Sequence, residues 1–135
     1  MFIRASRFAT RCIEHVDYTE RVKQHWDSSG QAGSRVYEGI QSVLSDLQED
    51  GYRLFIATVK PTPIAETVLE DLSLLPYFDG VAGSSMDHER RDKTSIIAHA
   101  LQKFELDPTR SIMIGDRDQD ILAARANGCL AYRFR

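Results

Sequence analysis

From residue 37 onward the sequence alternates between helical patterns and short apolar runs, and this alternation restricts the fold more than any other feature. Apolar residues at helical spacing, together with capping residues, predict helices over 37–50, 62–72, 96–104 and 118–127. Apolar runs of strand length lie at 52–57, 77–82, 111–114 and 129–134. Such alternation through short loops predicts an α/β fold, with a Rossmann-like parallel sheet between two layers of helices.

Residues 1–34 do not follow this alternation, so we expect an N-terminal helical segment there and a core over 35–135. A helix in this segment would carry an apolar face made of Phe8, Cys12, Ile13 and Val16. The first acidic residue is Glu14, and the arginines before it also give the stretch the composition of an organellar presequence. Both interpretations stay open. The small and polar residues at 27–34 predict a loop.

Composition excludes several classes of protein. The 135 residues carry a net charge of −3, which argues against a surface for nucleic acid or anionic membrane. No apolar run approaches the roughly 18–20 residues that span a bilayer. The two cysteines, Cys12 and Cys129, form no C-x-x-C pair and are too few for a disulfide framework. We therefore expect a cytoplasmic globular protein that binds neither nucleic acid nor membranes.

Ligands of parallel α/β sheets bind beyond the carboxyl ends of the strands, and polar residues stand at three such places. Thr58 follows the run 52–57 and precedes a helix start at Thr62-Pro63. Its hydroxyl and the free amides of that junction can hold a phosphate or carboxylate oxygen. An ordinary turn threonine is the alternative. Lys93, before the predicted helix 96–104, can neutralise an anion, or it can be a solvated lysine of a polar loop.

Two carboxylates follow the predicted strand 111–114. Asp116 stands at the end of that strand and Asp120 one helical turn further, so their side chains can converge. Mg²⁺ prefers few carboxylates, several waters and a substrate phosphate, so the pair predicts a metal site. Helix capping is the alternative; it suits Asp118, at the expected N-cap, better than Asp116 at a strand's end.

Taken together, these residues have the order of a known family. A hydroxyl after one strand, a lysine before a later helix and G-D-x-x-x-D after the next strand resemble the haloacid dehalogenase superfamily, phosphoglycolate phosphatase-like branch. The matching stretches are VYEGIQSVLSDLQEDGYRLFIATVKP, YFDGVAGSS and IMIGDRDQDILAARANG. The resemblance implies Mg²⁺-dependent hydrolysis of a small phosphomonoester through an aspartyl-phosphate.

The resemblance also implies a role for each candidate residue. Thr58 matches the residue whose hydroxyl binds the transferred phosphoryl group, and Lys93 matches the one that stabilises its charge. Thr58, Val59 and Lys93 are thus the expected phosphate-binding residues, and Thr58 and Lys93 the expected catalytic ones. Val59 stands where the family often has serine or asparagine, so side-chain help is lost there. Asp116 and Asp120 match the motif that positions Mg²⁺.

One motif of the family is absent. Members begin with a strand followed by D-x-D-x-T or D-x-D-x-V, whose first aspartate is the nucleophile, and neither pattern occurs here. Residues 1–34 are then expected to be a remnant of the helical cap, and the sheet to lack its first, central strand. That would leave two open strand edges unless another segment or chain fills the gap. Met1-Phe2-Ile3 offers a substitute strand, although no aspartate follows it.

Three hypotheses for the function follow. The first is a phosphatase-family protein whose beginning is missing, through truncation, a misplaced start or gene decay. It would be inactive alone because no aspartyl-phosphate can form, and its Mg²⁺ binding would be weakened by the missing ligand. The second is a non-catalytic module that holds phosphate or a small phosphorylated metabolite. The third is an interaction protein that completes its sheet with a partner chain or a second copy.

Overall fold

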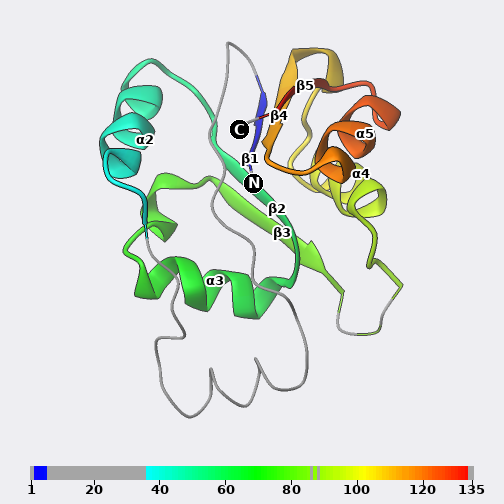
Figure 1. The fold of residues 1–135 in the computed structure, drawn as a ribbon, viewed down its shortest axis with the longest axis horizontal. Coiled ribbons are helices and arrows are strands. Elements are labelled where there is room, and N and C mark those ends of the chain that lie inside the picture. The colour runs from blue at the N-terminus through cyan, green and yellow to red at the C-terminus, as the bar shows by residue number, and fades with distance from the viewer. Residues whose placement is uncertain (1, 6–35, 86, 88, 134–135) are drawn as a thin grey trace.

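A computed structural model describes residues 2–5, 36–85, 87 and 89–133, in which a five-stranded sheet lies between two layers of helices (Figure 1). The strands are β1 (Phe2–Ala5), β2 (Phe55–Pro61), β3 (Gly80–Ser84), β4 (Ser111–Gly115) and β5 (Leu130–Arg133). The helices are α2 (Ile40–Glu49), α3 (Thr62–Asp71), α4 (Lys93–Lys103) and α5 (Asp118–Ala126). The expected three-layer α/β architecture is confirmed. No helix of the described part is long and apolar enough to cross a membrane.

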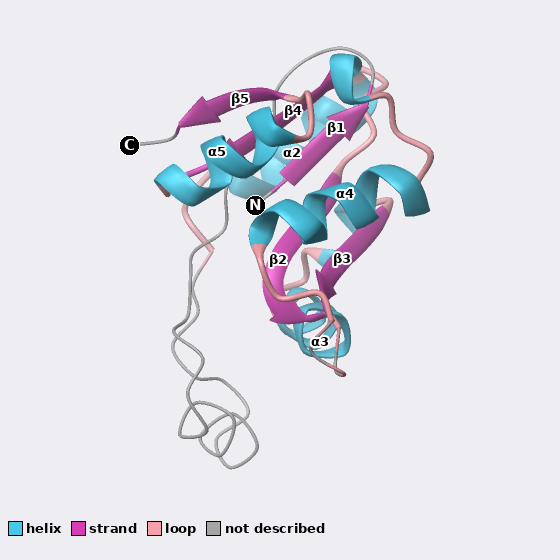
Figure 2. Ribbon diagram, turned by 90° about the vertical axis from the view of Figure 1, so that its right-hand side faces the viewer, coloured by secondary structure: helices cyan, strands magenta, loops and turns pink. Residues whose placement is uncertain are grey.

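The central strand of the sheet comes from the start of the chain. The strand order is β3-β2-β1-β4-β5, and β1 runs antiparallel to both of its neighbours, whereas β2–β3 and β4–β5 are parallel pairs (Figure 2). The expectation that the sheet lacks its central strand is therefore wrong, because another segment of the chain fills the gap and leaves no open edge there. The substitute strand expected at Met1-Phe2-Ile3 is confirmed for Phe2 and Ile3 and continues to Ala5, whereas Met1 lies outside the described residues.

These four residues also correct the expectation of a helical N-terminal segment where it falls on them. A strand here pairs with the inner edges of β2 and β4 at the same time, so many backbone N–H and C=O groups gain partners that a local helix would leave unpaired. The rest of the expected segment, residues 1 and 6–34, lies outside the described residues, and the cap interpretation stays a prediction.

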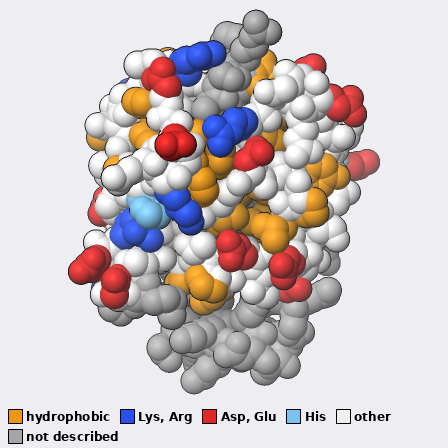
Figure 3. Space-filling model, turned by 180° about the vertical axis from the view of Figure 1, so that it is seen from behind, with side chains coloured by type: hydrophobic (Ala, Val, Ile, Leu, Met, Phe, Trp, Pro, Cys, Tyr) orange, Lys and Arg blue, Asp and Glu red, His pale blue; other side chains and the backbone are white. Residues whose placement is uncertain are grey.

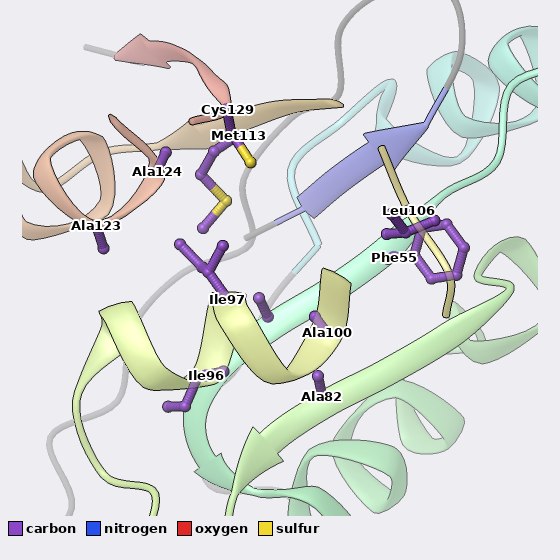
Figure 4. Close-up of a cluster of buried hydrophobic side chains, with 11 residues drawn as sticks. Phe55, Ala82, Ile96, Ile97, Ala100, Leu106, Met113, Ala123, Ala124 and Cys129 are labelled. Carbon is purple, nitrogen blue, oxygen red and sulfur yellow. The ribbon is translucent and has the colours of Figure 1, made fainter. Parts of the chain in front are cut away.

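Each face of the sheet buries one apolar cluster. On one face, α4 and α5 pack against the sheet around Phe55, Ile97 and Met113 (Figure 4). The ring of Phe55 is fully buried and stacks on that of Phe104, with the ring centroids 4.8 Å apart. On the other face, α2 and α3 cover a second cluster around Ile56. The two clusters hold the buried first half of β2 between them, and this positions Thr58 and Lys60 in the second half of the strand.

Several element boundaries differ from the predicted ones. The expected strand 77–82 begins only at Gly80, because Leu75–Tyr77 form a 3₁₀ turn that contains Pro76. Thr62 is the first residue of α3 and not its N-cap. Its hydroxyl instead accepts a hydrogen bond from Gly83 N at 3.0 Å, which ties the start of α3 to β3.

Candidate functional site

Lys93 is the first residue of α4, and its side chain crosses from that helix to the sheet. Its Nζ lies 3.3 Å from Asp120 Oδ1 and 3.5 Å from the carbonyl oxygen of Ala57. Only 11% of the Lys93 side chain and 5% of the Asp120 side chain are exposed. Lys93 is therefore part of a buried ion pair that joins α4, α5 and β2, and not a solvated lysine of a surface loop.

Asp120 is held from a second side by its own helix. The backbone N–H of Arg117 donates to Asp120 Oδ2 at 3.4 Å. Gly115, the last residue of β4, lies so close that a Cβ there would overlap the Asp120 carboxylate. A glycine is thus required where the buried carboxylate packs against the strand. No role was predicted for Gly115, although its place directly before Asp116 is a signal that could have identified it.

The remaining acids of this segment face solvent. Asp116 follows β4 directly and is exposed at the carboxyl end of the strand. Asp118 is exposed too and forms an ion pair with Arg133 of β5. The N-cap of α5 is Arg117, so the expected capping role of Asp118 is wrong by one residue.

The acids supply hard oxygen donors, which suit Mg²⁺ in kind. They are few. Asp116 is an exposed carboxylate, and the two oxygens of Asp120 contact Lys93 and the backbone N–H of Arg117. Within the described residues, no group of three or more His, Cys, Asp or Glu side chains could hold a metal ion. The donor chemistry therefore fits Mg²⁺, and the number of donors predicts weak binding.

Thr58 lies inside β2 and not after it, because the strand continues to Pro61. The pairing of β2 with β3 shifts register between Ala57 and Pro61, so Thr58 begins an irregular stretch. Its Oγ1 accepts a hydrogen bond from Lys60 N at 3.2 Å, which is the local bond of a turn threonine. Thr58 also directly follows Ala57, whose carbonyl the Lys93 ammonium contacts. Val59 is 37% exposed.

Two further basic groups have altered pKa values. Burial lowers the pKa of Lys60 to about 8, so half of that amine is uncharged near this pH and its attraction for an anion falls above it. Burial, and then the charges of Arg90 and Lys103, lower the pKa of His99. The face seen in Figure 3 carries basic side chains beside a histidine, with acidic side chains around them, so its charge is mixed in sign.

The direction of β1 decides what else can reach this site. Phe2 lies opposite Ile56 and Ile114, two residues before Thr58 and Asp116, so the start of β1 points toward the site. The last residue of β1, Ala5, lies opposite Ser111, the first residue of β4, and so at the other end of the strands. Ala5 is therefore at the opposite end of the strands from Lys93.

Comparison with known proteins identifies the family. The sequence model described as "Haloacid dehalogenase-like hydrolase" matches residues 3–132. The chain belongs to this family. A crystal structure of a predicted phosphatase from Clostridium acetobutylicum is similar to this haloacid dehalogenase-like chain with a TM-score of 0.76 and 34% sequence identity, over 81% of this chain and 50% of the other.

Two curated relatives carry different names. The tyrosine-protein kinase PtkA of Mycobacterium tuberculosis is 36% identical over 103 residues, which are 76% of this chain and 35% of PtkA. The phosphoglycolate phosphatase of Vibrio vulnificus is 28% identical over 113 residues, which are 84% of this chain and 50% of the phosphatase. This haloacid dehalogenase-like chain thus spans about a third of the length of PtkA and about half the length of the phosphatase.

Proposed function

We propose that this chain binds a small phosphorylated metabolite at the carboxyl edge of its sheet and, by itself, does not hydrolyse it. The observation that carries the proposal is the direction of β1. In this family the nucleophilic aspartate follows the central strand. Here the central strand ends beside the amino end of β4, whereas Lys93 and Asp116 lie at the carboxyl ends of the strands. No D-x-D-x-T or D-x-D-x-V stands elsewhere in the sequence to replace it.

Each residue has a distinct part in the proposed binding. Lys93 supplies positive charge, and its ion pair with Asp120 holds the ammonium beside the Ala57–Thr58 segment. Thr58 supplies a hydroxyl and, with Val59, backbone amides that can donate to phosphate oxygens. A hydrogen bond to a charged group contributes more than a neutral one, so these contacts favour a phosphate dianion over an uncharged ligand.

Mg²⁺ enters the proposal as an accessory ion. Asp116 and Asp120 would hold the ion, with Asp116 as the exposed ligand, and the ion would offset charge on the bound phosphate. We expect the affinity to be low because, among the described residues, no three His, Cys, Asp or Glu side chains come together around a metal position. Asp116→Asn should abolish any rise in melting temperature caused by Mg²⁺.

The proposed ligand class, a small phosphorylated metabolite, is broader than the substrates that the relatives' names indicate. A kinase and a phosphoglycolate phosphatase are both similar to this chain, and both names refer to a reaction of a phosphoryl group. Hydrolysis of a phosphomonoester remains the family reaction. This chain could take part in it only if another segment brought a nucleophile to the carboxyl ends of the strands. We also propose a cytoplasmic location. It is supported by the cysteine usage, since Cys12 and Cys129 are too few for a disulfide framework and form no C-x-x-C pair.

Titration calorimetry with inorganic phosphate tests the proposed site. We expect Thr58→Val to weaken phosphate binding by about tenfold to a hundredfold, since a hydrogen bond to a charged group contributes about 1.5–3 kcal/mol. Thr67→Val is the matched control, because the exposed Thr67 hydroxyl bonds only within α3, to Pro63 O, among the interactions of the described residues. Equal phosphate affinity in the two variants would remove Thr58 from the site.

A further inference from the structure

We propose that Asn127, at the end of α5, is a positioning residue that fixes where the Lys93 ammonium lies in the phosphate site. The inference rests on the proposed function, in which Lys93 supplies the positive charge. Asn127 acts through the backbone of α4, because its side chain binds the residue that directly follows Lys93.

The carboxamide of Asn127 joins two helices. Its Nδ2 donates to the carbonyl oxygen of Ala123 at 2.8 Å, within its own helix, and to that of Thr94 at 3.0 Å, in the first turn of α4. Carbonyl oxygens only accept hydrogen bonds, so both contacts require the NH₂ end of the carboxamide. Asn127 is also the C-cap of α5, and its backbone N–H donates to Ala123 O and Ala124 O. The side chain is thus held at the end of α5 with one N–H directed to α4.

The start of α4 is therefore tied to α5 at two levels. The backbone at Thr94 is bound by Asn127, whereas the Lys93 ammonium lies 3.3 Å from Asp120 in the first turn of α5. Asp120 and Asn127 are separated by about 10 Å along a helix, at 1.5 Å per residue. An extended lysine side chain reaches on the order of 6 Å from Cα to Nζ, so it covers most of that length. The Lys93 side chain thus runs along α5 with little slack.

The two ties have different effects on the ammonium. An ammonium is a compact point charge with rotatable donors, so the Asp120 carboxylate can hold it from many directions. The bond at Thr94 fixes the other end of the side chain, where Lys93 leaves the backbone. With both ends fixed, Nζ also lies 3.5 Å from Ala57 O, beside Thr58. Without the bond at Thr94, the start of α4 can shift and the ammonium can move away from Ala57 while it stays paired with Asp120.

Gly128→Ala is the matched control, because a C-cap such as Asn127 also stabilises its own helix. Gly128 directly follows Asn127 and has a φ of +76°, at which an alanine is strained. A Cβ there would lie 3.8 Å from Pro108 Cβ, which is an ordinary contact. The substitution should therefore destabilise the same end of α5 and keep the bond from Asn127 to Thr94.

Two measurements test the positioning of Lys93. Calorimetry gives the affinity for inorganic phosphate, and mass spectrometry gives the rate at which acetic anhydride acetylates Lys93, relative to the exposed Lys103. We expect Asn127→Ala to weaken phosphate binding about threefold to tenfold, the range that one hydrogen bond contributes. The relative acetylation rate of Lys93 should rise severalfold, because its side chain, 11% exposed in the wild type, leaves its place. Gly128→Ala should change each quantity by less than about twofold.

Equal changes in the two variants would overturn the inference, since they would reflect the stability of α5 alone. Unchanged phosphate affinity or unchanged Lys93 acetylation in Asn127→Ala would overturn it as well. A wild-type chain that binds no phosphate would refute the proposed function. In that case the acetylation rates still test the positioning, which requires a faster rate for Lys93 in Asn127→Ala than in Gly128→Ala.

Discussion

Lys93→Met is expected to destabilise the fold by about 3–5 kcal/mol and to abolish the binding of inorganic phosphate. The cause of the first effect is Asp120, whose carboxylate would be left buried without its cation. The second effect follows because the site would lose the charge beside Ala57 and Thr58. Urea unfolding measures the free energy of unfolding, and calorimetry on the folded variant measures the binding.

A matched control lies on the same helix. Lys103→Met removes a lysine from the last turn of α4, where no ion pair within the described residues depends on it. We expect it to change stability by less than about 1 kcal/mol. Adding Asp120→Asn to Lys93→Met should restore much of the lost stability but not the phosphate binding, since both charges are then gone. A loss from Lys93→Met no larger than that from Lys103→Met would show that the pair contributes little.

Phe55→Ala is expected to destabilise the fold by about 3–5 kcal/mol, because a fully buried ring would be replaced by a cavity. The stacking on Phe104 is lost as well, and the ring lies on the strand that leads to Thr58. We therefore expect the stretch of β2 around Thr58 to become less ordered as the fold loses stability. The free energy of unfolding in urea measures the effect.

Leu122→Ala is the control for the ring deletion. Leu122 is 65% exposed on α5, so its truncation should change stability by less than about 0.5 kcal/mol. Similar values for the two variants would mean that the packing around Phe55 is not the main source of stability in this half of the core.

The helices and the parallel strands could be predicted because their signals are local. In α4, Ile96, Ile97 and Ala100 repeat at helical spacing, and all three are buried as the pattern predicts. The start of that helix needed a further signal. Asp92 accepts a hydrogen bond from Ser95 N at 2.9 Å, and this N-cap makes Lys93 the first helical residue and not a loop residue.

β1 could not be predicted with the same certainty, because strand pairing is decided by distant residues. Phe2–Ala5 are too few for a periodic pattern, and the edges of β2 and β4 that select them lie more than fifty residues away in the sequence. The candidate site, too, has a part that local signals predict and a part that depends on tertiary packing. The order of Thr58, Lys93 and Asp116 along the chain pointed to one edge of the sheet. The burial of the Lys93–Asp120 pair depends on how α4 packs beside α5, which no local pattern reveals.

Phosphate release from a panel of small phosphomonoesters tests the central claim most directly. The assay is run with Mg²⁺ and with EDTA, on the wild-type chain and on Asp116→Asn, using protein whose cooperative urea unfolding shows that it is folded. The reversed direction of β1 predicts no release above background in any arm, while inorganic phosphate still binds to the wild-type chain. Release that requires both Mg²⁺ and Asp116 would contradict this account, because a group other than the missing aspartate would then attack the phosphorus.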